Sequence, residues 1–465
     1  MVVNNSFKIA YLCIRFFKFM SLPEAFIKRI QNQIPDWERF VKSLDTSAPV
    51  SVRLNPHKPV GCLEVAERVP WCNTGYYLHQ RPIFTLDPLF HAGTYYVQEA
   101  SSMFIEQVVR QYIDRPVRTL DLCAAPGGKT THLLSLLPGG SLLVSNEFIR
   151  SRAHILAENV SKWGYPSVVV TNNAPKDFSH YESFFDLIVV DAPCSGEGMF
   201  RKDSGAVEEW SEYNVQQCEL RQRQIISDVW GSLSENGVCI YSTCTYNPNE
   251  DEEMVKWIEQ ELGAEELLVP VDERWGIVRS ERGYHFYPHM SKGEGFYLCV
   301  LRKTSLSPIG RQRARHKITL NSTKNQKEIM SHYLVPHDWH LAFLRERIVA
   351  LSSDYVEWML DMMQNLKVMQ AGVPLGRWIG KNFLPDPSLA LSVCLKDNST
   401  EVFDVNKETA LSFLHKDAIT LPPDMEKGMV LIRYKGHGLG WVKNLGNRCN
   451  SLFPDEWRIR MRIDK

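Results

Sequence analysis

The chain has no cysteine pair of the CxxC type, although it contains 11 cysteines in 465 residues. Zinc ribbons and disulfide-stabilised small domains both rely on paired cysteines, and an odd number suits neither. Most of these cysteines lie instead in apolar, strand-like runs, such as the one around Cys239. We therefore predict free thiols in a reducing compartment, and no metal site.

Long apolar runs are missing as well. A membrane-spanning helix needs about 18 or more consecutive apolar residues, and the apolar start of this chain is interrupted by Arg15 and Lys18. It also lacks the small-residue cleavage site of a secretory signal. We expect a cytoplasmic protein with no membrane partner. Ser21 and Glu24 have the spacing of a helix capping box directly after Met20, so we expect Met20 to be the true start and residues 1–20 to be an extension.

Neither sign of charge predominates, because 53 basic residues face 54 acidic ones. Only the distribution along the chain can then indicate a polyanionic partner. Between Arg302 and Lys327 lie eight basic residues and no acid, and Lys427–Lys465 contains nine basic residues and three acids. The first segment predicts either a solvated linker or a phosphate contact. The second contains aromatic residues that suit either base stacking or burial in a small β-rich domain; they are Tyr434, Trp441, Phe453 and Trp457.

Strand-like runs alternate with amphipathic helical stretches through the middle of the chain. The runs cover residues 118–123, 141–146, 167–171, 185–190, 238–243 and 296–301. This alternation is typical of parallel βαβ units and predicts an α/β fold with a doubly wound sheet. We predict a small α/β accessory domain over residues 21–92, the doubly wound domain over 93–303, a basic linker over 304–330 and a C-terminal region over 331–465. Residues 332–366 have a helical pattern.

A glycine-containing loop follows the first of these strands and opens a helix. Such a loop places backbone N–H groups against a ligand at the carboxyl edge of a sheet, which predicts a nucleotide-type site. A phosphate-binding P-loop would need glycine at Cys123, and the G-x-G-x-x-G of dinucleotide sites is absent. The candidate residues are Cys123, Ala124, Ala125, Pro126, Gly127, Gly128 and Lys129.

Polar residues end the next two strands. Glu147 can accept hydrogen bonds from both hydroxyls of a ribose, or can simply be a solvated acid that caps a helix. Asn172 and Asn173 follow the third strand, where an amide side chain could recognise the amino group of an adenine. We include Glu147 and Asn173 among the predicted cofactor-binding residues.

Two cysteines follow consecutive strands, Cys194 in an Asp-x-Pro-Cys turn and Cys244 in Ser-Thr-Cys-Thr. In an open α/β sheet both strand ends face the crevice that holds the cofactor loop. Each cysteine alone is more often a small buried hydrophobic residue, but the two together favour chemistry. Asp191 can hydrogen-bond a substrate, and Lys129 is a possible source of the positive charge that stabilises a thiolate.

Three segments carry a resemblance to a known family: CAAPGGKT at 123–130, DAPCSGEGMFRKD at 191–203 and STCTYNPNEDE at 242–252. They are similar to the Sun/Fmu family of RNA cytosine-5 methyltransferases, and most closely to its RsmF-type members, which act on bacterial small-subunit ribosomal RNA. The likeness spans nearly the whole chain after Met20 and includes VRLNP at 52–56 and WVKNLGNR at 441–448.

The resemblance implies a Rossmann-like core that uses S-adenosylmethionine, with a small N-terminal RNA-binding domain and a PUA-like RNA-binding region at the C-terminus. The implied reaction is methylation of carbon 5 of a specific cytosine in 16S ribosomal RNA, with ribosomal RNA or the small subunit as partner. We expect a monomer. Carbon 5 of cytosine becomes nucleophilic only after a thiolate has added to carbon 6. The family implies that Cys244 is this nucleophile, that Cys194 assists product release, and that Asp191 lies in the cofactor site.

Several alternatives remain at this stage. In DNA cytosine-5 methyltransferases the Pro-Cys motif supplies the nucleophile, which would be Cys194, and the residues alone do not separate the two assignments. A transfer-RNA methyltransferase would share every catalytic residue, and an RNA-binding ribosome assembly factor would keep the cofactor site unused. A nucleotide hydrolase is disfavoured by Cys123. The sequence also departs from the family at Ala174, where an aspartate is expected.

Overall fold

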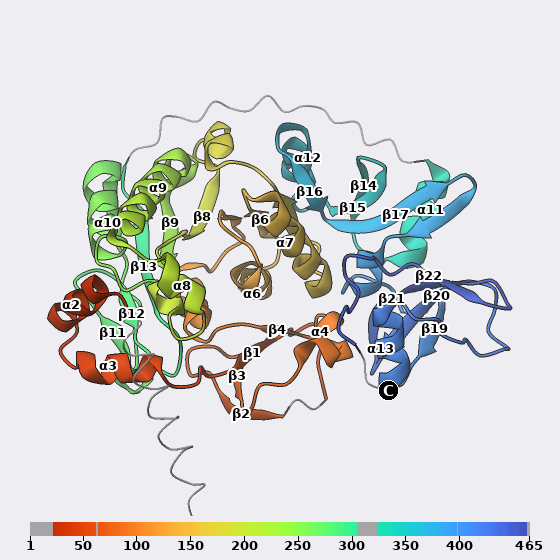
Figure 1. Cartoon of the computed structure of the whole chain (residues 1–465). Coiled ribbons are helices and arrows are strands. Elements are labelled where there is room, and N and C mark those ends of the chain that lie inside the picture. The colour runs from red at the N-terminus through yellow and green to blue at the C-terminus, as the bar shows by residue number, and fades with distance from the viewer. Residues whose placement is uncertain (1–21, 62–63, 306–322, 398, 463–465) are drawn as a thin grey trace, which may run out of the picture.

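The computed structural model describes residues 22–61, 64–305, 323–397 and 399–462 (Figure 1). The expectation for Met20 and most of the basic linker lie outside these residues. Helix α2 (Glu24–Gln33) begins at Glu24 after Pro23, with no side-chain cap. Glu24 is therefore the first residue of the helix, whereas a capping box needs it at the third helical position.

A ten-stranded sheet forms the centre of the molecule, in the order β11-β12-β13-β9-β8-β5-β6-β7-β16, with β10 also paired to β13. Its antiparallel strands include β10 (Ala264–Glu266), β11 (Ile277–Arg279), β12 (Tyr284–Phe286) and β16 (Val368–Ala371). Its inner strands β5 to β9 are parallel. All six strands predicted between residues 118 and 301 are confirmed, although β9 begins earlier than expected. They are β5 (Arg118–Asp121), β6 (Leu142–Asn146), β7 (Val168–Thr171), β8 (Phe185–Asp191), β9 (Leu233–Thr243) and β13 (Phe296–Lys303). The predicted doubly wound α/β fold is thus confirmed.

Helices cover both faces of this sheet because its inner strands are apolar on both sides. One face packs against α5 (Ile105–Tyr112), α6 (Gly128–Leu136) and α7 (Arg150–Trp163). The other packs against α9 (Glu212–Trp230), α10 (Glu252–Trp257) and α12 (Val356–Asn365). From β5 the sheet continues with β6 and β7 on one side and with β8 and β9 on the other, so the strand order reverses at β5. A crevice for ligands forms at such a switch point, beyond the carboxyl ends of the strands.

The N-terminal unit is the small α/β domain that the sequence predicts. Helices α2 and α3 (Trp37–Leu44) precede a four-stranded antiparallel sheet in the order β2-β3-β1-β4. Its strands are β1 (Ser51–Leu54), β2 (Val65–Arg68), β3 (Gly75–Leu78) and β4 (Tyr95–Val97). Because β4 belongs to this sheet, the unit extends beyond the expected boundary at residue 92.

The helical prediction for residues 332–366 is wrong for its central part. Helix α11 (Lys324–Tyr333) includes residues expected in the linker, and β14 (Trp339–Leu344) and β15 (Arg347–Ser352) then form a hairpin before α12. The turn contains Arg345 in a left-handed conformation, with φ of 58°. Buried, β-branched Ile348 and Val349 favour a strand here, so packing overrides the helical periodicity.

The C-terminal region continues with two four-stranded sheets. The first, β14-β15-β17-β18, adds β17 (Val373–Ile379) and β18 (Asn382–Pro385) to the hairpin. The second, β19-β20-β21-β22, packs against α13 (Lys407–His415) and comprises β19 (Glu401–Asp404), β20 (Gly428–Tyr434), β21 (His437–Asn444) and β22 (Cys449–Ser451). Tyr434, Trp441 and Phe453 are buried here, which supports burial rather than base stacking as the explanation for these aromatics.

The C-terminal region contacts the rest of the chain at several places, including α12 on the central sheet and the hydrogen bond from the Val393 N–H to the Gly164 carbonyl after α7. Strand β16 (Val368–Ala371) pairs antiparallel with β7 at the edge of the central sheet. One hydrophobic cluster also contains residues of the N-terminal sheet, such as Val52, together with C-terminal residues such as Val430. Figure 1 shows the N-terminal strands along the bottom of the molecule, below its core, with α4 (Pro88–His91) next to the C-terminal helix α13.

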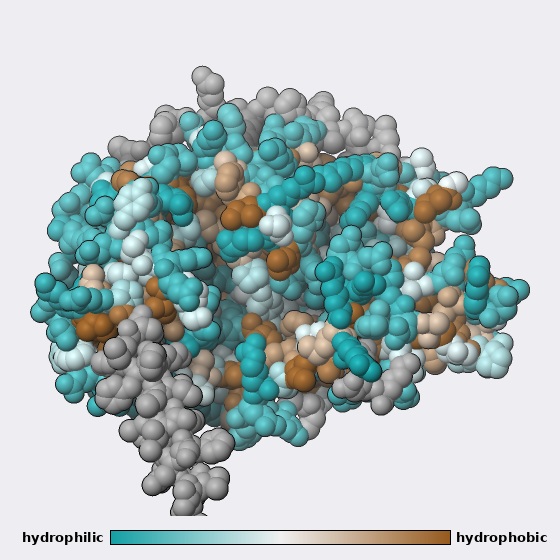
Figure 2. Space-filling model, viewed as in Figure 1, coloured by the Kyte–Doolittle hydropathy of each residue, from teal (hydrophilic) through white to brown (hydrophobic). Residues whose placement is uncertain are grey.

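The surface in this view is mainly hydrophilic, with scattered hydrophobic patches (Figure 2). Among the described residues, no helix is long and apolar enough to cross a membrane.

Candidate active site

The two predicted cysteines meet at the carboxyl ends of β8 and β9. These strands are parallel neighbours in which Asp191 pairs with Ser242, so the turns that follow them emerge side by side. The sulfur atoms of Cys194 and Cys244 are 3.2 Å apart, and the backbone N–H of Cys244 donates to the Cys194 sulfur over 3.3 Å. Both side chains are partly exposed. Both thiols can therefore act on neighbouring atoms of one bound substrate.

Asp191 connects these cysteines to the cofactor loop. Its Oδ1 lies 2.8 Å from Nζ of Lys129, at the start of α6, and accepts a 2.8 Å hydrogen bond from Ser242 Oγ. Oδ2 has no partner among the described residues and can accept a bond from a ligand. The Lys129 ammonium also lies 5.0 Å from the centre of the Phe296 ring. Lys129 thus holds Asp191 directly, and this contact was not part of the role predicted for it.

Side chains of α7 fix the cofactor loop from behind. Arg152 donates to the Ala125 carbonyl over 2.8 Å, and Asn159 donates to the Pro126 carbonyl over 2.8 Å. Gly127 caps α6 with φ of 114°, a left-handed conformation that other residues rarely adopt. The loop therefore has a fixed backbone, with Gly128 and Lys129 opening the helix, as a ligand-binding loop at a helix N-terminus requires.

A buried arginine of the N-terminal sheet supports α6 from below. Arg53 on β1 donates to Gln98 Oε1 over 2.8 Å and to Thr131 Oγ1 over 2.6 Å, and its guanidinium lies 4.5 Å from the centre of the Trp163 ring. Burial lowers the pKa of Arg53 to about 10. The N-terminal domain is thereby attached to the helix that begins at the cofactor loop.

The polar residues after β6 and β7 have separate positions. Glu147 is buried, accepts a hydrogen bond from the Ile149 N–H over 2.9 Å, and lies 3.5 Å from Arg152. Asn172 donates to the carbonyls of Glu147 and Phe148. Asn172 therefore fixes the backbone around Glu147 and has both side-chain protons engaged.

Asn173 is turned to other partners. Its amide donates to Asp177 Oδ2 over 3.1 Å and accepts from the N–H of Lys367 over 3.0 Å. The N–H of Ala174 also donates to Asp177. Asp177 thus supplies a carboxylate beside Ala174, the position where the family pattern has an aspartate, while the Asn173 side chain is engaged within the protein.

Sequence reasoning missed two buried glutamates behind the cysteines. Glu250 accepts from the Ser195 N–H over 2.9 Å, from Ser195 Oγ over 2.5 Å and from Gln222 over 2.9 Å. Burial raises the pKa of Glu250 to about 7. Glu197 forms a 2.6 Å ion pair with Arg29 of α2 and accepts from the N–H of Tyr246. Each glutamate links the turn after β8 to the loop after β9, and both lie in the quoted motifs.

A third missed residue is Phe148, whose side chain is 67% exposed directly after Glu147. An exposed aromatic ring next to a ribose acceptor can cover the face of an adenine. Its only sequence signal was its position after the strand end.

The environment of Cys194 favours its neutral form. The pKa of its thiol lies well above the usual value, first because of its hydrogen bond with Cys244 and then because of burial. The pKa of Asp121, at the end of β5, is raised to about 7 by burial, although Thr130 donates to this carboxyl over 2.6 Å. A thiol that stays protonated beside a second thiol can donate a hydrogen bond to a thiolate there.

Three family models match successive parts of the chain. Residues 22–100 match the N-terminal domain of 16S rRNA methyltransferase RsmF, residues 114–302 match 16S rRNA methyltransferase RsmB/F, and residues 400–459 match the methyltransferase RsmF PUA domain. The chain is 28% identical to ribosomal RNA small subunit methyltransferase F of Vibrio campbellii, over 94% of this chain and 97% of that protein. It is also 28% identical to the protein of that name from Erwinia tasmaniensis, over 93% and 96%.

Solved structures agree with this fold. The structure of PH0851 matches with a TM-score of 0.55 and 23% identity, over 62% of this chain and 67% of that one. NSun6 from Pyrococcus horikoshii with SFG matches with a TM-score of 0.51 and 18% identity, over 61% and 98%. The domain matches occur in the same order as the three parts of the structure, and the chain is therefore similar to 16S rRNA methyltransferase RsmB/F over residues 114–302 and to the N-terminal and PUA domains of RsmF on either side.

Proposed function

We propose that the protein transfers a methyl group to carbon 5 of a cytosine in 16S ribosomal RNA, through a covalent bond between Cys244 and carbon 6. The observation that carries this proposal is the 3.2 Å separation of the Cys194 and Cys244 sulfurs beside Asp191. Methyl transfer to an oxygen or nitrogen needs no thiol, whereas carbon 5 of cytosine needs one thiolate for attack and a base for its proton. The related proteins named for small-subunit ribosomal RNA support the substrate.

The cofactor site suits S-adenosylmethionine. The loop from Cys123 to Gly128 presents backbone groups at the switch point of the sheet, and Glu147 offers a carboxylate for ribose hydroxyls. The neighbouring Pyrococcus structure was determined with SFG, an analogue of that cofactor. When bound, S-adenosylmethionine supplies the electrophilic methyl group. Asn173 would contribute through the loop it fixes, since its amide is engaged by Asp177 and Lys367.

The proposed roles of the two thiols use their direct contact. Across the 3.2 Å separation either thiol can donate, and in the proposed order Cys194 donates to the Cys244 sulfur as that sulfur becomes the attacking thiolate. Cys244 then attacks carbon 6, and Asp191, held by Lys129 and Ser242, hydrogen-bonds the base through its remaining oxygen. The contact alone fits either thiol as the nucleophile, and the resemblance to RNA cytosine-5 methyltransferases supports Cys244.

Product release needs a base that becomes available late. Once Cys244 is bonded to carbon 6, its sulfur is a weak acceptor, so the largest cause of the raised pKa of Cys194 disappears. Cys194 can then lose its proton to solvent and remove the proton from carbon 5. The electron pair returns through the ring, the bond between carbon 6 and sulfur breaks, and Cys244 leaves as a thiolate. The base must be flipped out or lie in a loop to enter the site.

The test is transfer of labelled methyl from S-adenosylmethionine to purified ribosomal and transfer RNA, with wild type, Cys244→Ala and Cys194→Ala. Cys449→Ala is the matched control, because it removes a partly exposed thiol of the C-terminal sheet. We expect 5-methylcytosine in 16S ribosomal RNA, none with Cys244→Ala, and a covalent protein–RNA adduct on denaturing gels with Cys194→Ala.

Other results would redirect the proposal. An active Cys244→Ala variant would remove the nucleophile assignment. Labelling of transfer RNA alone would replace the substrate, and absence of labelling in every RNA form would favour an assembly factor that does not use its cofactor site.

A further inference from the structure

Three metal-ligating side chains converge behind the loop that follows Cys244. Asp251 and Glu252 lie at the start of α10, and His285 lies on β12 (Tyr284–Phe286). One donor atom from each residue lies within 4.8 Å of the other two. His285 and Asp251 are buried, and Glu252 is half-buried. Because the donors come from separate segments, no spacing in the sequence predicts this group.

Each of the three residues has a buried atom without a hydrogen-bond partner among the described residues: Asp251 Oδ2, Glu252 Oε2 and His285 Nδ1. The other atoms are engaged, since Thr243 donates to Asp251 Oδ1 over 2.6 Å and His285 Nε2 lies 2.7 Å from Glu252 Oε1. A buried oxygen of a carboxylate that lacks a partner is strongly unfavourable.

A nearby hydroxyl relieves this deficit only in part. Ser280 Oγ donates to the carbonyl of Arg282 over 2.6 Å and also lies within hydrogen-bond reach of Glu252. Asp251 Oδ2 and His285 Nδ1 are the buried atoms that remain without a partner among the described residues.

A cavity of about 380 Å³ opens onto the group, and its walls are acidic. Glu252 and His285 line it together with Asp36, Glu253 and Glu281. No lysine or arginine is among its described lining residues. A cation and its water ligands can thus enter from solvent. The other wall carboxylates are paired, Asp36 with His289, Glu253 with Lys256 and Glu281 with Arg282, so the attraction for a cation comes mainly from the group itself.

A second cluster serves as a contrast. Cys72, Glu106 and His132 also converge, and all three are buried. There the Glu106 carboxylate is satisfied by the Asn73 N–H over 3.1 Å, by Arg110 over 2.8 Å and by His132 over 3.2 Å. Both Glu106 oxygens are thus paired within the protein, and only His132 Nδ1 lacks a partner among the described residues, whereas in the first group the carboxylate oxygen Asp251 Oδ2 lacks one as well.

We propose that Asp251, Glu252 and His285 bind one divalent transition-metal ion, with water from the cavity completing its coordination. Two carboxylates and one imidazole suit Mn²⁺, Fe²⁺ or Zn²⁺ better than Mg²⁺ or Ca²⁺, which prefer oxygen ligands alone. The ion would take no part in methyl transfer. Because Asp251 is bonded to Thr243, the residue before Cys244, the ion would fix the end of β9 that carries the nucleophile.

The experiment measures metal content and stability of the full-length protein. After treatment with a chelator, the protein is equilibrated with Mn²⁺ or Zn²⁺ alone and freed of excess ion. The amount of bound metal is measured by inductively coupled plasma mass spectrometry, and Tm is measured by scanning fluorimetry. We expect about one equivalent and a Tm higher by several degrees than that of the metal-free protein.

Variants locate the site. Asp251→Asn keeps the acceptor for Thr243 and is expected to weaken metal binding at least about tenfold, as is His285→Asn, which serves if the first variant folds poorly. Cys72→Ser, the control in the contrasting cluster, should still hold one equivalent. The proposal would be overturned if wild-type protein retained no ion, or if the Asp251→Asn variant bound metal as tightly as wild type. The three side chains would then be a buried hydrogen-bonded group without a metal.

Discussion

Asp121 gives a prediction of how stability depends on pH. The carboxyl is fully buried at the end of β5, and its pKa is raised by burial from 3.8 to about 7. The folded protein therefore keeps a proton that the unfolded chain has released, so this group lowers stability as pH rises from about 4 to 7. Linkage over this window makes the folded state about 2–3 kcal/mol less stable at pH 8 than at pH 5 through this residue alone.

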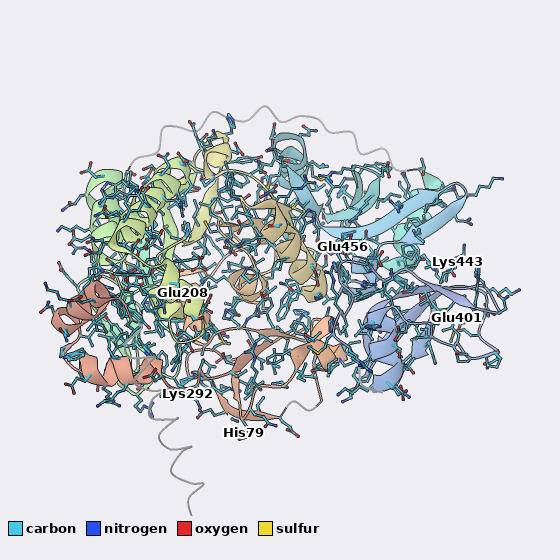
Figure 3. All side chains as sticks on the ribbon, viewed as in Figure 1. His79, Glu208, Lys292, Glu401, Lys443 and Glu456 are labelled. Atoms are coloured by element: carbon cyan, nitrogen blue, oxygen red, sulfur yellow. The ribbon has the colours of Figure 1, made fainter. Side chains whose placement is uncertain are left out.

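Asp121→Asn removes this dependence, because an amide resembles the neutral acid and its oxygen can still accept from Thr130. We expect urea unfolding to show that the variant gains about 2–3 kcal/mol relative to wild type between pH 5 and pH 8. Glu208→Gln is the control, since Glu208 is exposed on α8 (Ser204–Glu209; Figure 3) and its removal should leave the difference from wild type unchanged with pH. An equal difference between Asp121→Asn and wild type at both pH values would refute the reasoning.

Two further substitutions test how the domains are held together. Arg53→Met should cost about 2–3 kcal/mol, because it leaves Gln98 and Thr131 without their donor, and should raise KM for S-adenosylmethionine; unfolding and methyl-transfer kinetics measure the two effects. Gly164→Ala should cost at least about 1–2 kcal/mol, because Gly164 has φ of 85° and a Cβ there would lie 2.2 Å from the Leu391 carbonyl. A Tm equal to that of wild type would contradict the second expectation.

Much of the fold could be predicted because local pattern and tertiary packing agree in the core. The apolar runs of β5 to β8 are buried on both faces, and short turns separate them from their helices. The apolar pattern and the turn residues therefore both indicate parallel strands. In residues 332–366 the two signals conflict. There, the apolar spacing fits a helix, while the turn at Arg345 and packing against β17 favour a hairpin.

The site divides in a similar way. Cys194, Cys244 and Asp191 could be placed together because parallel neighbours end at the same edge of a sheet. The residues that hold these side chains in place could not be predicted. Glu250 and Glu197 make hydrogen bonds between two separate loops, and Arg29 of α2 pairs with Glu197. Asn173 shows the converse. Its position after a strand end predicted a free amide, but the N–H of Lys367, directly before β16, donates to its oxygen. No local pattern in the sequence predicts this distant contact.

The pairing of β16 with β7 fixes the distance between the two cysteines and the C-terminal sheets. A C-terminal module on a flexible tether would let the reactive thiols sample many points of a bound RNA, whereas a shared sheet holds the two at one separation. Under the proposed function, the target base would then be selected partly by its distance from the RNA segment that contacts the C-terminal sheets. A fragment ending at residue 303 would lose that selection, and it would also leave β7 as a bare edge strand open to association with other chains.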